Sequence, residues 1–73
     1  MTDEDIDRHI GKRMRSIRRG ADIRQSEIAA ALGISESQVQ RYERGTNSIS
    51  VPKLFKVAAE LKVPLVSLFD GLL

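Results

Sequence analysis

The stretch QSEIAAALGISESQVQRYER, residues 25–44, constrains the fold of this chain more than any other. In its first half, Ile28, Ala29 and Leu32 recur at the spacing of one helical face. Gly33 follows at once, and glycine readily takes the positive φ that ends a helix sharply. The sequence therefore predicts a short helix that runs from the start of this stretch and stops abruptly after Leu32.

The second half of the stretch predicts another short helix, over residues 36–44. Ser35 is a favourable N-cap, and Gln38 lies at the spacing of a capping box. Val39 and Tyr42 then give this helix an inward-facing side. An abrupt helix end, an apolar turn and a capped second helix are typical of a DNA-binding helix-turn-helix. A plain helical hairpin within a bundle is the alternative.

Three further helices are predicted around this pair. The first covers about residues 3–19 and carries an apolar stripe: Ile6, Ile10, Met14 and Ile17. Another begins near Pro52 and carries the same kind of stripe: Leu54, Val57, Ala58 and Leu61. A last short helix opens at Pro64 and closes at Asp70 and Gly71. The prediction is an all-α, compact five-helix fold that forms a single domain over residues 1–73, with the helix-turn-helix at 25–44.

The first predicted helix has one unfavourable residue. Thr2 can cap its start, and the acidic residues that follow suit the positive end of the helix dipole. Gly11, however, lies in its interior, where glycine costs roughly 1 kcal/mol relative to alanine. We therefore expect the first turns of this helix to be frayed.

The composition excludes several classes of function. The chain has no Cys and one His, so disulfides, Cys-ligated zinc and thiol catalysis are excluded. It has no Gly-rich phosphate loop and no catalytic constellation, so we expect no enzyme activity, no cofactor and no metal. No apolar run approaches the roughly 20 residues of a membrane span, and the N-terminus is acidic, unlike a signal peptide. We expect a cytoplasmic protein with no membrane partner and, for want of an effector domain, no small-molecule ligand.

Charge is distributed unevenly along the chain. Four of the ten acidic residues lie within the first seven positions, and all 12 Lys and Arg residues follow them. The remainder therefore carries 12 basic and six acidic side chains, which fits a polyanionic partner such as DNA. A basic solvated surface would have the same composition.

The second helix of the helix-turn-helix has the chemistry to read DNA. Helix geometry, with the apolar side facing the core, places Ser37, Arg41 and Arg44 on the outward face and Gln38 and Gln40 on its flanks. Arginine can bond bidentately to guanine, and glutamine to adenine, in the major groove. A solvated helix surface has the same residue types and is the alternative interpretation.

Two acidic residues of this helix differ in what they need. Glu36, at its start, could accept from cytosine N4, or it could serve the helix dipole and avoid DNA. Glu43 points towards the core and needs a partner, for which Arg18 is the natural choice. After the helix, polar and basic residues cluster around one loop and helix start, where they suit phosphate binding: Arg44, Thr46, Asn47, Ser48 and Lys53.

With these residues placed, the chain resembles the Xre/Cro-type helix-turn-helix repressors, which have the lambda-repressor-like fold. The resemblance covers about residues 10–72 and is carried by IGKRMRSIR, QSEIAAALGIS, QVQRYERGTNSIS and LFKVAAELKVPLVSLF. The run QVQRYERGTN is similar to that of small regulators from alpha-proteobacteria. The resemblance implies binding to double-stranded DNA.

The resemblance also implies roles for matching residues. Gln25 matches a residue that touches a phosphate, and Asn47 matches a loop residue that reaches DNA in some members. Arg24 departs from the Ser or Thr usual there, which puts the N-cap in doubt but adds a cation beside the expected phosphate. Taken with the helix geometry, the predicted base-reading residues are Glu36, Ser37, Gln40, Arg41 and Asn47. The predicted phosphate contacts are Arg24, Gln25, Gln38, Arg44, Thr46, Ser48 and Lys53.

The favoured function is that of a sequence-specific transcription regulator at the bacterial nucleoid. We expect a repressor that binds a palindromic operator as a homodimer. Dimerisation is expected through the C-terminal helix, which has more apolar groups than a small core can cover: Leu65, Leu68, Phe69, Leu72 and Leu73. The alternative is an antitoxin-like or regulatory module that also binds a protein partner.

Overall fold

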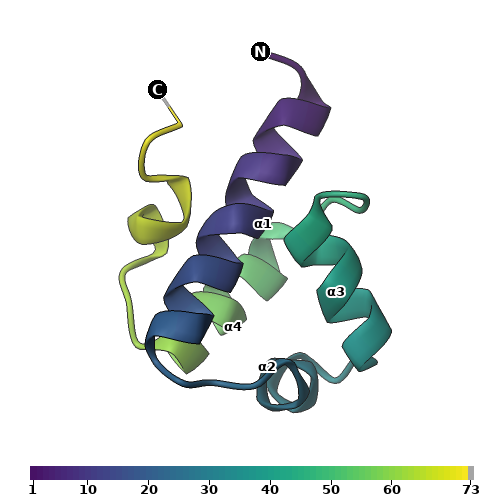
Figure 1. The fold of residues 1–73 in the computed structure, drawn as a ribbon, viewed down its shortest axis with the longest axis vertical. Coiled ribbons are helices and arrows are strands. Elements are labelled where there is room, and N and C mark those ends of the chain that lie inside the picture. Colours follow the sequence, from purple (N-terminus) through teal and green to yellow (C-terminus); the bar gives the residue numbers. More distant parts are fainter. Residues whose placement is uncertain (73) are drawn as a thin grey trace.

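The structure, a computed structural model, describes residues 1–72 and is helical throughout, as predicted. Its elements are α1 (Asp3–Gly20), α2 (Gln25–Leu32), α3 (Glu36–Arg44), α4 (Val51–Leu61) and the short helix η1 (Leu65–Phe69). In Figure 1, α1 crosses the middle of the molecule, with α3 on one side and the C-terminal segment on the other. α1 packs against α3, α4 and η1, while α2 packs against α3 and α4. Within the described chain, no helix has the length and apolar character needed to cross a membrane.

The predicted fifth α-helix was wrong, because the segment after Pro64 forms a 3-10 helix of only five residues. The backbone N–H of Ser67 donates to the Pro64 carbonyl at 2.9 Å, three residues back. Two carbonyls of this segment contact side chains of α1 instead of continuing a helix. Arg13 Nε donates to the Ser67 carbonyl at 2.9 Å, and His9 Nε2 lies 2.6 Å from the Asp70 carbonyl oxygen.

The first turns of α1 are helical and capped, contrary to the expected fraying. Thr2 Oγ1 accepts from the backbone N–H of Asp5 at 3.1 Å, and the Asp5 carboxylate accepts from the backbone N–H of Thr2 at 3.0 Å. Gly11 is buried where α1 crosses α3, and a Cβ there would overlap the carbonyl oxygens of Tyr42 and Glu43. The glycine therefore allows the two helices to cross closely.

The predicted glycine stop at Gly33 is present, and Gly45 ends the next helix in the same way. Gly33 and Gly45 have φ of 68° and 75°, and they end α2 and α3 respectively. After each glycine, a backbone N–H donates back to the helix at 3.0 Å: Ile34 to Ala29, and Thr46 to Arg41. These turns fix the angle at which α3 leaves α2 and the path of the loop towards α4.

The hydrophobic core draws on every element. Its buried residues are Ile10, Met14, Ile28, Ala29, Leu32, Val39, Tyr42, Leu54, Val57, Ala58, Leu61 and Leu68. All the predicted stripe residues of α4 are buried, and the stripe of α1 is buried at Ile10 and Met14 and partly buried at its two ends. The core thus holds α2 and α3 rigidly against α1 and α4.

Candidate nucleic-acid interface

The outward face of α3 presents the residues predicted to enter the major groove. Val39 and Tyr42 are buried and hold the opposite side of the helix in the core. Ser37, Arg41 and Arg44 are exposed, as helix geometry predicted. The face is therefore accessible to a partner over the whole length of α3.

Gln38 contacts Arg41 within α3. Its side-chain oxygen accepts a hydrogen bond from Nη1 of Arg41 at 3.2 Å. Ser35 Oγ accepts from the backbone N–H of Gln38 at 3.1 Å, but the Gln38 side chain does not return to the N-cap, so the predicted capping box is half formed. The contact orients the Arg41 guanidinium and leaves most of its N–H donors free. Gln40 is partly buried on the other flank.

A buried ion pair joins α1 to α3, as the sequence predicted. Arg18 Nε donates to Glu43 Oε2 at 2.7 Å, and Arg18 Nη2 donates to Glu43 Oε1 at 3.1 Å. The two side chains are 11% and 4% exposed. Gln25 Nε2 also donates to Glu43 Oε1 at 2.9 Å, and Arg18 Nη1 donates to the Ile23 carbonyl at 2.9 Å. The Glu43 carboxylate thus fixes the start of α2 relative to α1 and α3.

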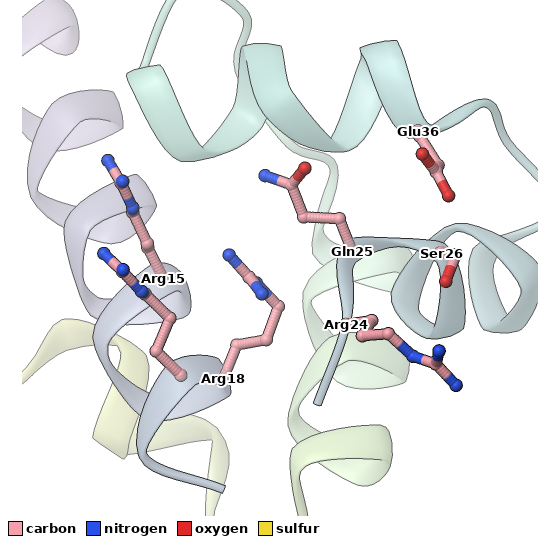
Figure 2. A pocket seen from close by; sticks show the side chains of 7 residues that line it. Arg15, Arg18, Arg24, Gln25, Ser26 and Glu36 are labelled. Carbon is pink, nitrogen blue, oxygen red and sulfur yellow. The ribbon is translucent and has the colours of Figure 1, made fainter. Parts of the chain in front are cut away.

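A basic depression opens between the second half of α1 and the start of α2. It has a volume of about 460 Å³ and is lined by Arg15, Arg18, Arg19, Arg24, Gln25, Ser26 and Glu36. Figure 2 shows Arg15 and Arg18 on α1, with the Arg18 side chain extending towards Gln25. Arg18 is neutralised by Glu43, whereas Arg15, Arg19 and Arg24 are exposed. The depression therefore has the size and charge to receive a phosphate group.

The departure at Arg24 changes how α2 is capped. The Arg24 guanidinium can only donate, so it cannot accept from the helix, and no side-chain cap is formed. Glu27 Oε2 instead accepts from the backbone N–H of Arg24 at 2.7 Å. Within residues 1–72, the backbone N–H groups of Gln25 and Ser26 have no hydrogen-bond partner. The start of α2 thus keeps two free donors beside the arginines.

Arg15 is a candidate that the sequence analysis missed. It lines the basic depression and two adjoining ones, one with Gln40 and Arg44 and one with Lys12. The basic surface therefore continues from the helix-turn-helix onto α1. Arg15 lies three residues before Arg18, so the two side chains are on the same side of α1. Because Arg18 was expected to face α3, this spacing could have identified Arg15.

The loop between α3 and α4 uses two of its predicted phosphate donors internally. Thr46 Oγ1 donates to the Arg41 carbonyl at 3.2 Å, and Ser48 Oγ donates to Asp7 Oδ2 at 2.5 Å. A hydroxyl has a single hydrogen, so neither residue can donate to a phosphate while these bonds last. Asn47 between them is exposed, and its side chain makes no hydrogen bond within the described residues. Lys53, in the first turn of α4, is partly buried.

The C-terminal segment keeps only part of the predicted dimer surface. Leu68 was wrongly expected to lie there, because η1 turns it completely into the core. Val66, by contrast, is 68% exposed. It lines an open depression of about 610 Å³ with five other residues: Ser67, Phe69, Asp70, Gly71 and Leu72. Leu65 packs partly against the core, and Leu73 lies outside the described residues.

No group of three or more His, Asp or Glu side chains in the described chain is placed to hold a metal ion. Of the predicted contact residues, Gln25, Gln40 and Arg44 line one depression together with Arg15, and Arg24, Gln25 and Glu36 line another with it. Their contacts with DNA stay predictions, since the geometry concerns the free protein.

Known proteins are similar to this chain in sequence and in fold. The helix-turn-helix family model HTH_3 matches residues 14–68. An uncharacterised transcriptional regulator in the ATPase CF(0) region of Rhodospirillum rubrum is 39% identical over 67 residues, which are 92% of this chain and 62% of that protein. The antitoxin PezA of Streptococcus pneumoniae is 36% identical over 59 residues, which are 81% of this chain and 37% of PezA. The chain thus spans less than two thirds of the length of these relatives.

A solved structure is also similar to this chain in fold and in sequence. The restriction-modification controller protein C.AhdI from Aeromonas hydrophila has a TM-score of 0.80 and 29% identity, covering 89% of this chain and 97% of its own. The segment that the family model matches, residues 14–68, contains α2 and α3 and most of the core. The chain therefore belongs to the HTH_3 helix-turn-helix family, the Xre-type DNA-binding transcription regulators.

Proposed function

We propose that α3 reads the base sequence of an operator and that the chain acts as a repressor. The observation that carries this proposal is the exposed face of Ser37 and Arg41 on a helix whose other side is buried. Arg41, oriented by Gln38, can bond guanine O6 and N7. Three further residues of the same helix would contact the edges of neighbouring bases: Glu36, Ser37 and Gln40. Repression is favoured because it requires only that the operator be occupied.

Phosphate contacts on both sides of α3 would set its register. On one side we assign Arg24, Gln25 and Arg15, where the free N–H groups at the start of α2 add to the positive potential. Arg44, at the end of α3, lines a depression with Arg15 and Gln25 and belongs to the same group, and on the other side we assign Lys53. Thr46 and Ser48 can donate to DNA only after their hydrogen bonds within the protein break. The side-chain oxygen of Gln38 already accepts a hydrogen bond from Arg41. These three are therefore the weaker candidates.

We further propose that two copies pair through the C-terminal segment. The support is the exposed side chain of Val66, which lines one open depression with the partly buried Phe69 and Leu72. Two-fold pairing would set the two α3 helices about 34 Å apart, one turn of DNA. The operator would then be palindromic, with half-sites one helical turn apart.

Selection of bound sequences from a random DNA pool tests the proposed function. The expected result is one enriched palindrome whose half-sites are separated by about one DNA turn. Selection repeated with Arg41→Ala should lose preference at one base position in each half-site. A pool that shows no enriched motif would contradict base reading, and a single unpaired half-site would contradict the dimer.

The similarity to PezA supports a second candidate, a regulator that also binds a protein partner. Such a partner would occupy a surface away from α3. A gene for a toxin-type protein beside the gene for this chain would favour this candidate if the two purified proteins bind each other and DNA in a titration. The absence of binding between the two purified proteins would remove it.

A further inference from the structure

The loop between α3 and α4 is joined to α1 by the hydrogen bond from Ser48 Oγ to Asp7 Oδ2, which spans 41 residues of sequence. We infer that Asp7 is a positioning residue for DNA reading: it holds the loop that presents Asn47, and its charge limits the affinity for all DNA. The inference rests on the proposed function and on the contact between Asn47 and DNA predicted from the sequence, and it adds a residue outside the helix-turn-helix.

The two ends of the loop are fixed by the fold. Gly45 lies so close to α1 that a Cβ there would be 2.6 Å from the Cα of Arg8. Thr46 returns to the Arg41 carbonyl through both its backbone N–H, at 3.0 Å, and its hydroxyl, at 3.2 Å. Ile49 packs against the core, and Ser50 caps α4. In this loop, residues 47 and 48 have neither a backbone hydrogen bond nor a core contact within the described residues.

The bond to Asp7 therefore decides where the middle of the loop lies. Asn47 is exposed and has no side-chain partner in the described part of the chain, so only its backbone position aims it. Ser48 is its neighbour and is attached through its side chain to a rigid helix. Without that bond, Asn47 would have to be ordered when DNA binds, and the ordering would weaken base discrimination.

Asp7 also carries a charge that its neighbours do not neutralise. The guanidinium of Arg8 pairs with Asp5 at 2.8 Å, and no ion pair within residues 1–72 includes Asp7. Asp3, Glu4 and Asp5 lie in the turns before it. A phosphate that approaches Ser48 meets the acidic side chains in the first turns of α1. The resulting repulsion is independent of base sequence and is screened by salt.

Four variants of the whole chain separate the two effects: Asn47→Ala, Ser48→Ala, Asp7→Ala and Asp7→Asn. Binding is measured on the selected site and on random DNA at several salt concentrations, after melting curves have shown that each variant folds. Asn47→Ala should lower the ratio of specific to random affinity. Ser48→Ala and Asp7→Ala should lower it about 2- to 10-fold, the range for one hydrogen bond.

Asp7→Asn keeps an oxygen that can accept from Ser48 and removes the charge. It should leave the ratio unchanged and tighten binding to both DNAs at low salt, with the gain fading as salt is raised. Glu60→Gln is the matched control, because Glu60 is an exposed acid near the far end of α4. It should tighten binding less than Asp7→Asn.

The double variant Asn47→Ala/Ser48→Ala tests whether Ser48 acts through Asn47. The expected result is that Ser48→Ala has no further effect on the ratio once Asn47 is gone. If Asn47→Ala lowers the ratio while Ser48→Ala and Asp7→Ala do not, the inference fails and the proposed function stands. If Asn47→Ala changes nothing, base reading by the loop fails as well. Equal tightening by Glu60→Gln and Asp7→Asn would overturn the electrostatic part.

Discussion

Among single residues, Glu43 has the most demanding surroundings. Its carboxylate is buried and accepts from Arg18 and Gln25, so loss of a partner leaves a charge uncompensated. Breaking a buried pair typically costs about 3–5 kcal/mol. Because Arg18 keeps 11% exposure, we expect Arg18→Met and Glu43→Gln to lower the free energy of unfolding towards the lower end of that range.

Urea unfolding of both variants measures this loss. Glu36→Gln, an exposed acid at the start of the same helix, is the control and should change stability little. Unchanged unfolding midpoints for both Arg18→Met and Glu43→Gln would show that the pair is not structural.

The sequence was sufficient to predict this ion pair but not every residue that contacts it. Helix spacing turned Glu43 inward, and Arg18 was expected to be its partner. Gln25 was expected to serve only DNA, yet its amide also donates to Glu43. Arg15 was not predicted, although it lies three residues before Arg18 on the same side of α1. That it lies beside Gln40 and Arg44 depends on how α1 packs against α3.

At the scale of elements, the crossing of α1 and α3 depends on Gly11. Alanine there is favoured by helix propensity by roughly 1 kcal/mol. Its Cβ would nevertheless overlap backbone oxygens, which cannot move aside as a side chain could. We expect Gly11→Ala to destabilise the protein by about 1–3 kcal/mol, the usual cost of overpacking.

Gly20→Ala is the matched control for that substitution. Gly20 is the last residue of α1, and a Cβ there meets nothing within 4 Å. Its stability should be unchanged or slightly higher. A Gly11→Ala variant as stable as wild type would mean that the two helices do not cross as closely as described.

The start of α1 should depend on pH through Asp5. The hydrogen bond from the backbone N–H of Thr2, then that from its hydroxyl, and the nearby Arg8 lower the pKa of Asp5 below 3.8. A lowered pKa means that the cap stabilises α1 at neutral pH and is lost as pH falls through the folded-state value. NMR chemical shifts of residues 3–6 should therefore lose helical character in acid below the ordinary Asp range. Asp5→Asn should remove that step, and its persistence would assign it to another group.

Elements encoded by local signals were predicted best. The boundaries of α2 and α3 follow from Gly33, Ser35 and Gly45, whose effects are local. The 3-10 form of η1 depends on Arg13 and His9, which lie more than 50 residues away in sequence. The bond between Asp7 and Ser48 likewise joins distant segments. Such contacts exist only after folding, so spacing within one segment cannot predict them.

At the scale of the whole molecule, the proposed dimer makes a direct prediction. Val66→Glu places a charge on the exposed C-terminal surface and should give a monomer in sedimentation experiments. Phe55→Glu is the control, because Phe55 is 58% exposed on α4, outside the proposed surface. Val66→Glu should bind an isolated half-site normally and the full operator more weakly. A dimer that persists in Val66→Glu would place the interface elsewhere.

The central claim is that α3 reads bases through Arg41, while Arg44 at its end binds the DNA backbone. Binding curves for Arg41→Ala and Arg44→Ala, on the selected site and on random DNA at several salt concentrations, test it most directly. Arg41→Ala should lose about 1–3 kcal/mol on the selected site and little on random DNA. Arg44→Ala should weaken both DNAs alike and lower the salt slope by about one. The reverse pattern would exchange the two roles, and binding unchanged in both variants would contradict the account.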